Sequence, residues 1–168
     1  MTVIFCHGLE STPHGRKYQA LVGAGLDVIS PDFQGQDLAA RVATLAPVLR
    51  SAEAPVLVGS SYGGITALCA AIQFVEAGGV LRGLVLCAPA LARSEPPADG
   101  MVLYPPAPTI IIHGIHDEVV PASVSQGFAA LHPEVQLVLV DDAHQLAGSI
   151  ETILAATRAM AQGLPFTP

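Results

Sequence analysis

Short apolar runs recur along the chain, and most of them are bounded by Gly, Pro or Asp residues. Runs of this length flanked by turn-forming residues predict β-strands. Most of them are continuously apolar rather than alternating, which is typical of strands buried on both faces of a sheet. The predicted strands are Val3–Cys6, Leu26–Ser30, Val56–Val58 (stopped by Gly59), Leu84–Cys87, Thr109–Ile112 and Val135–Val140.

Between these runs, apolar residues recur at intervals of three and four positions, which predicts amphipathic helices. Pro47 argues against a regular last turn in the second of them, and Gly78-Gly79 ends the third. The predicted helices are Arg16–Val22, Leu38–Leu49, Ile65–Val75, Ser123–Leu131 and Leu146–Met160.

The alternation of strands and helices predicts βαβ units, and therefore an α/β fold with a parallel sheet. For 168 residues we expect one domain, a three-layer α/β/α sandwich with a mostly parallel sheet of six strands. In such sheets ligands bind beyond the carboxyl ends of the strands. Residues that carry chemistry should therefore follow strands rather than precede them.

One segment, residues 88–108, interrupts the alternation and is rich in proline. A loop of this length is uncommon in a compact domain and is often functional. Two interpretations stay open: a short lid or insert that contacts the substrate, and a solvent-facing connector.

Composition narrows the class of protein. The chain is 51% hydrophobic and 12% charged, which is too apolar for a disordered protein. No apolar run reaches the roughly 18 residues of a membrane-spanning helix, and no basic segment precedes the first apolar run. We expect a cytoplasmic protein. A net charge of −7 argues against nucleic acid or an anionic membrane as a partner.

Cys6, Cys69 and Cys87 each lie in an apolar segment. We expect buried, reduced thiols that take no part in catalysis, because a strand interior offers nothing to activate a thiolate.

Gly59-Ser60-Ser61-Tyr62-Gly63 fits the pattern G-x-S-x-G and lies between a predicted strand and a predicted helix. This setting is that of a nucleophile elbow, a turn so tight that glycine is needed on both sides of the serine. The frame of the pattern makes Ser61, and not Ser60, the candidate nucleophile. The alternative is a strand-to-helix turn in which Ser61 is only an N-cap.

A serine hydroxyl needs a base, and the base needs an acid that orients it. His144 follows the sixth predicted strand and Asp117 follows the fifth, so both should lie at the same edge of the sheet as Ser61. His14 is a less favoured base because nothing orients it. The competing acids are Glu118, Asp141 and Asp142.

His7-Gly8-Leu9 follows the first predicted strand. The backbone N–H groups of Leu9 and Tyr62 are candidates for an oxyanion hole. The alternative is that His7-Gly8 is only a turn. A metal site made of His113, His116 and Asp117 matches no strong zinc spacing. No phosphate-binding or dinucleotide-binding glycine motif is present, so we expect no cofactor.

Together, His7-Gly8-Leu9, the G-x-S-x-G segment, His113-Gly114-x-x-Asp117-x-Val119-Val120-Pro121 and Ala143-His144 resemble the α/β-hydrolase superfamily, over nearly the whole chain. Within it the chain is similar to small bacterial serine esterases with little or no cap. The order Ser61, Asp117, His144 is the order of that family. The resemblance implies a nucleophile, an orienting acid and a general base, respectively, with oxyanion donors at Leu9 and Tyr62.

The function that we expect is hydrolysis of a small carboxylic ester or thioester through an acyl-serine intermediate. An amidase, a lyase on the same scaffold and a binding protein without catalysis are the alternatives. From proximity to the motifs, the candidate pocket residues are Leu91, Tyr104, Val119 and Leu146.

Overall fold

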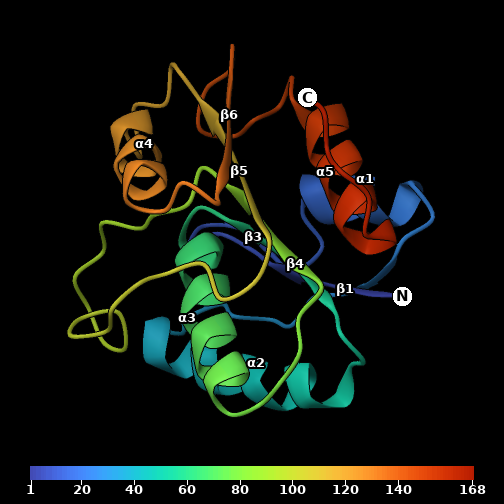
Figure 1. Ribbon diagram of the computed structural model, residues 1–168, viewed down its shortest axis with the longest axis vertical. Helices are drawn as coiled ribbons and strands as arrows, with labels where there is room; N and C mark the ends of the chain where they lie inside the picture. The colour runs from blue at the N-terminus through green and yellow to red at the C-terminus, as the bar shows by residue number, and fades with distance from the viewer.

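The computed structural model describes residues 1–168, and its six strands form a single sheet in which every neighbouring pair is parallel (Figure 1). The order across the sheet is β2-β1-β3-β4-β5-β6. This arrangement confirms the predicted fold class. The strands are β1 (Thr2–Cys6), β2 (Asp27–Ile29), β3 (Val56–Ser60), β4 (Gly83–Cys87), β5 (Thr109–Gly114) and β6 (Gln136–Val140).

Five helices cover the two faces of the sheet (Figure 1). One face packs against α1 and α5, and the other against α2, α3 and α4. The crossover from β1 to β2 runs in one direction across the sheet and the later crossovers run in the other. Because such crossovers are right-handed, α1 lies on the opposite face from α2, α3 and α4. The helices are α1 (Arg16–Gly23), α2 (Leu38–Ser51), α3 (Tyr62–Glu76), α4 (Ala122–Leu131) and α5 (Ile150–Gln162).

The central strands are buried on both faces, as their apolar composition predicts. Leu57 and Leu84 face the layer of α2 and α3, whereas Val58 and Val85 face α5, and all four are fully buried. Each such side chain contributes about 1.5–3 kcal/mol by leaving water. The edge strand β2 differs, since two of its three residues are exposed.

Several predicted boundaries are wrong, and three of them have a clear physical reason. β3 continues through Gly59 to Ser60. α2 continues through Pro47 to Ser51, because the burial of Leu49 and its neighbours outweighs the roughly 3 kcal/mol that proline costs inside a helix. α5 begins at Ile150 rather than Leu146, since Leu146 adopts a left-handed conformation with φ of 52°.

Residues 88–108 contain no helix or strand. The segment is not simply exposed to solvent, because Leu91 and Ala98 are buried in the core cluster that contains α2 and α3. Its Tyr104 hydroxyl lies 3.2 Å from Glu76 Oε1, on the last turn of α3. The assignment of this segment as a lid stays a prediction.

No helix of the structure has the length and apolar composition that crossing a membrane requires.

The three cysteines are buried, as predicted, and unpaired. Burial raises the pKa of Cys6 to about 12, and that of Cys69 and of Cys87 to about 11. Thiols in this state form little reactive thiolate at neutral pH.

We expect no thiol of the native protein to react with iodoacetamide at pH 8 within the time in which all three react in urea. Mass spectrometry of the intact chain counts the adducts. Rapid alkylation of a single cysteine in the native protein would contradict this description of the core.

Candidate active site

Ser61 occupies the junction between β3 and α3, with a left-handed backbone conformation of φ 56° and ψ −117°. A non-glycine residue in such a conformation costs about 1–3 kcal/mol and persists only where its surroundings hold it. Two backbone hydrogen bonds do so: Ser61 N–H donates to the Cys87 carbonyl at 2.9 Å, and Ser61 C=O accepts from Ala90 N–H at 3.0 Å. The junction therefore depends on the end of β4.

Glycine is required on both sides of Ser61. A Cβ atom at Gly59 would lie 2.8 Å from the Cα of Gly64, and one at Gly63 would collide with the carbonyl oxygen of Cys6 at the end of β1. α3 therefore starts in contact with the backbone of the neighbouring strand. Ser61 thus lies beyond the carboxyl end of β3, at the first turn of α3.

Three side chains from distant parts of the sequence lie in a chain of hydrogen bonds. His144 Nε2 lies 2.9 Å from Ser61 Oγ, and His144 Nδ1 lies 2.7 Å from Asp117 Oδ2. An ionised carboxylate accepts, so Nδ1 carries the proton and Nε2 accepts from the serine hydroxyl. This tautomer is the one that a general base requires.

The surroundings of Asp117 favour its ionised form. Burial raises the pKa of this carboxyl group, but hydrogen bonds from His144 and from the backbone N–H groups of Val120 and Val119 outweigh it and hold the pKa below its usual value. Buried His113 lies 3.1 Å from Oδ2 of the same carboxylate. Asp117 thus remains an anion at neutral pH and can stabilise a protonated His144.

The loop that carries His144 is held by contacts that the sequence did not reveal. The Asp142 carboxylate accepts hydrogen bonds from Ala143 N–H, Gly148 N–H and the Ser149 hydroxyl. Lys17 Nζ also donates to the Gln145 carbonyl, at 2.8 Å. Asp142 therefore positions the loop rather than acting as the orienting acid.

The loop after β1 lies against Ser61. A Cβ atom at Gly8 would lie 3.6 Å from the Ser61 Cβ, and Leu9 N–H has no hydrogen-bond partner within the protein. Tyr62 begins α3, so its N–H has no acceptor within the helix. Both groups are free to donate to an atom bound beside Ser61.

A buried cation, Arg41 of α2, fixes this loop from behind. Its Nη1 donates to the His7 carbonyl at 2.9 Å, and its guanidinium lies 4.6 Å from the centre of the Tyr62 ring. His7 is itself fixed, because its Nε2 accepts from Phe33 N–H at 2.9 Å. One fully buried side chain thus contacts both segments that carry the free N–H groups. Sequence periodicity did not indicate this role. It predicts that Arg41 lies on a helix, but it does not show which residues Arg41 contacts.

A cavity of about 770 Å³ opens over Ser61 and His144. Of the candidate pocket residues, Val119 lines it, together with Leu9 and Tyr62. The other three do not. Leu91 and Leu146 are buried in the core, and the Tyr104 hydroxyl is directed to Glu76. Gly8, Arg16, Lys17, Ala90 and Arg93 are lining residues that sequence reasoning missed.

The competing site residues take other partners. His113 donates to the Val120 carbonyl and contacts Ser125, whereas His116 pairs at the surface with Asp141. His113 also lies 3.1 Å from Asp117 Oδ2, but His116 is at the surface and does not join them. No group of three or more possible metal ligands is present. His14 packs on Tyr18 and does not line the cavity.

Gly63→Ala tests the contact between α3 and β1. We expect this change to destabilise the protein by about 3 kcal/mol or more, because a backbone carbonyl cannot move aside as a side chain can. The urea midpoint measures the loss. Gly127→Ala is the matched control, since it lies within α4 with no atom near its added Cβ and should be neutral or stabilising by up to about 1 kcal/mol. Equal stability of the two variants would contradict the tight junction.

Comparisons with known proteins agree with this architecture. The family model described as the alpha/beta hydrolase family matches residues 3–166. No curated protein sequence matches the chain. Among solved structures, a chain from Xanthomonas campestris pv. campestris assigned to the alpha/beta hydrolase superfamily is 27% identical with a TM-score of 0.79, and the alignment covers 97% of this chain and 98% of the other.

Two further structures share the fold at lower identity. A monoacylglycerol lipase of Paleococcus ferrophilus is 15% identical with a TM-score of 0.74, covering 96% of this chain and 94% of that one. The type II thioesterase BorB from the borrelidin biosynthetic cluster is 18% identical with a TM-score of 0.74, covering 96% and 91%. Since the family model spans nearly the whole sequence, the chain belongs to the alpha/beta hydrolase family.

Proposed function

We propose that this protein is a serine hydrolase that cleaves a small carboxylic ester or thioester. The observation that carries the proposal is the hydrogen-bonded chain Ser61–His144–Asp117, with distances of 2.9 and 2.7 Å. Ser61 and His144 line a cavity. Along the sequence the three residues follow the order Ser, Asp, His that is typical of the family.

In the first half of the reaction, Ser61 Oγ attacks the substrate carbonyl carbon while His144 Nε2 takes the hydroxyl proton. The C–O or C–S bond of the tetrahedral intermediate then breaks, and the same proton leaves with the alcohol or thiol. In the second half, water attacks the acyl-serine, His144 again takes and returns one proton, and the carboxylic acid and free Ser61 result.

The free N–H groups of Leu9 and Tyr62 support the oxyanion role. The negative charge of the intermediate develops on the former carbonyl oxygen, beside Ser61, where fixed donors stabilise it without reorganisation. Tyr62 N–H also stands at the start of α3, where the helix dipole favours negative charge.

Exposed apolar side chains at the cavity support an acyl substrate. Leu9 and Val119 line the cavity and expose 52% and 69% of their surface. Large apolar side chains exposed beside a polar site are typical of substrate contacts. The lipase and the thioesterase that share the fold act on ester and thioester bonds, as their names state, and by analogy this supports the choice of substrate bond.

Amide hydrolysis, lyase chemistry and binding without catalysis remain the alternatives. A complete hydrogen-bonded triad disfavours a binding protein, which has no use for an activated serine. An ester is favoured over an amide because its leaving group departs more easily.

Ser61→Ala tests the nucleophile. A fluorophosphonate probe should label the native protein at one site, and the variant should not be labelled at all. Ser60→Ala, which removes the adjacent hydroxyl, should keep labelling. Mass spectrometry of the labelled peptide locates the adduct, and an adduct on any residue other than Ser61 would refute the assignment.

Asp117→Asn tests the orienting acid. The amide cannot stabilise a protonated imidazole, and we expect kcat for a 4-nitrophenyl ester to fall by about 10⁴-fold. Asp141→Asn is the matched control, because Asp141 also lies 2.7 Å from a histidine nitrogen, that of His116, but at the surface. Similar losses in the two variants would argue against Asp117.

A further inference from the structure

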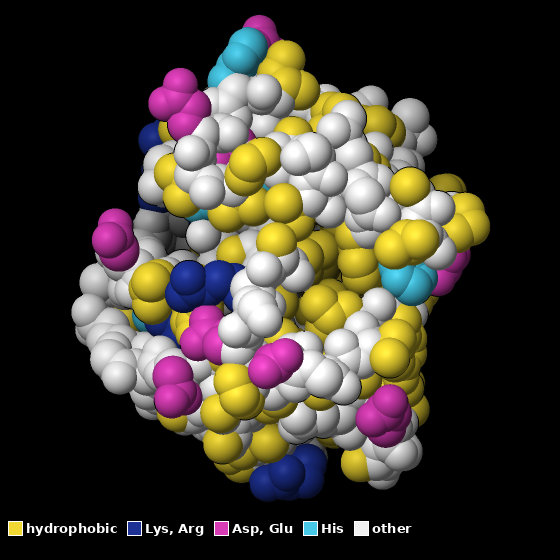
Figure 2. Space-filling model, turned by 90° about the vertical axis from the view of Figure 1, so that its left-hand side faces the viewer, with side chains coloured by type: hydrophobic (Ala, Val, Ile, Leu, Met, Phe, Trp, Pro, Cys, Tyr) yellow, Lys and Arg dark blue, Asp and Glu magenta, His cyan; other side chains and the backbone are white.

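The basic residues of this acidic chain are concentrated at one place. The chain has seven Lys and Arg against fourteen Asp and Glu. Three of the seven, Arg16, Lys17 and Arg93, line the cavity over Ser61, but Glu10 is the one acidic residue that lines it. On the face shown in Figure 2, dark blue Lys and Arg side chains are few. The wall of the cavity therefore has a charge opposite to that of the molecule.

Lys17 is the only lysine of the chain, and it is 9% exposed. It forms no ion pair, and the one hydrogen bond of its ammonium group goes to the neutral carbonyl of Gln145. Lysine is rarely buried to this extent without a counter-charge. Its ammonium group keeps two further donors.

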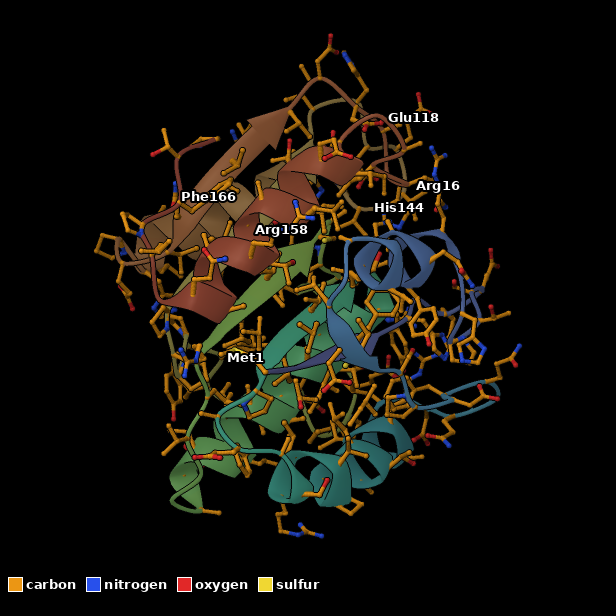
Figure 3. The ribbon with its side chains drawn as sticks, turned by 90° about the vertical axis from the view of Figure 1, so that its right-hand side faces the viewer. Met1, Arg16, Glu118, His144, Arg158 and Phe166 are labelled. Carbon is orange, nitrogen blue, oxygen red and sulfur yellow. The ribbon has the colours of Figure 1, made fainter.

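Arg16 precedes Lys17 in the first turn of α1, and it too forms no ion pair; its Nη2 donates to the Ala147 carbonyl at 3.2 Å. In Figure 3, Arg16 and His144 lie at the same corner of the molecule. Two cations in a first turn without an acidic residue or a side-chain cap oppose the helix dipole. A bound anion would offset both unfavourable features.

Arg93 comes to the cavity from the 88–108 segment. Its guanidinium lies 4.8 Å from the centre of the Tyr62 ring, and its Nε pairs with Glu95 at 3.1 Å. Glu95 neutralises part of this charge but does not line the cavity. The terminal nitrogens of Arg93 remain the groups with which a planar fork binds a carboxylate or phosphate.

We infer that the ester substrate of this site carries an anionic group, a carboxylate or a phosphate, which binds in the cavity among Arg16, Lys17 and Arg93. This inference rests on the proposed function. It explains why an acidic protein keeps three cations beside its candidate nucleophile. It also distinguishes the cavity from that of an esterase for wholly neutral acyl esters, where a buried lysine would only add a desolvation cost.

The test compares matched pairs of esters that differ in one charge. Mono-4-nitrophenyl adipate against 4-nitrophenyl hexanoate places the charge on the acyl side, and 4-acetoxybenzoate against its methyl ester places it on the leaving-group side. In at least one pair, we expect kcat/KM to be about 10-fold or more higher for the anion, as one charge-assisted hydrogen bond provides. Added salt should reduce this preference, because it screens the cationic wall.

Arg93→Gln and Arg16→Gln should each lower the ratio of charged to neutral kcat/KM. Arg158→Gln is the matched control, because Arg158 of α5 also donates one hydrogen bond to a backbone carbonyl, that of Ala24, but does not line the cavity. It should leave the ratio unchanged. If Arg16 only tethered the loop, its variant would lower both rates and leave their ratio unchanged.

Inorganic phosphate distinguishes the two anions. Competitive inhibition by phosphate at millimolar concentration supports a phosphate-bearing substrate. A charge preference without inhibition by phosphate supports a carboxylate. Equal or faster hydrolysis of both neutral esters by the native protein would overturn the inference and leave the proposed function standing. If the protein hydrolysed none of the esters and the fluorophosphonate probe did not label Ser61, both the inference and the proposed function would be overturned.

Discussion

The contact between the first turn of α3 and the end of β1 determines the geometry of the whole site. Gly63 lies so close to the Cys6 carbonyl that no side chain fits between them. This approach bends the chain sharply at Ser61, and the hydrogen bond from Ser61 N–H to Cys87 fixes the bend to β4. The nucleophile, the first N–H of α3 and the loop after β1 are therefore placed by one junction.

The residues with candidate chemistry could be predicted because the fold obeys a simple rule. In a parallel sheet all strands end at the same edge, so the loops that follow β3, β5 and β6 lie on one side of the molecule, where their side chains can meet. The G-x-S-x-G pattern predicts Ser61 and this rule predicts Asp117 and His144, and the structure places the three within hydrogen-bond distance. The sheet itself could be predicted from the continuous apolar runs, because strands buried on both faces need no polar positions.

The supporting contacts could not be predicted, because they join residues with no local pattern in common. Lys17 and Gln145 are separated by 128 positions, and Arg41 and His7 by 34. The start of α5 was misplaced for a related reason. Leu146 has a helical spacing of apolar residues after it, but the three hydrogen bonds to the Asp142 carboxylate hold a turn there instead. Of the pocket residues predicted from sequence proximity, Val119 lines the cavity, whereas Leu91 and Leu146 lie in the core.

The positions of the cations connect the geometry of the site to its electrostatics. Lys17 contacts the carbonyl of the residue that follows His144, so its charge is held at a fixed distance from the candidate base. Burial lowers the pKa of Lys17, an effect that the Asp142 carboxylate partly offsets, and a neighbouring anion would favour the charged form further. An anion bound in the cavity, as inferred above, would therefore keep Lys17 in its charged form. The same ammonium group would then contact both the inferred anion and the loop that carries His144.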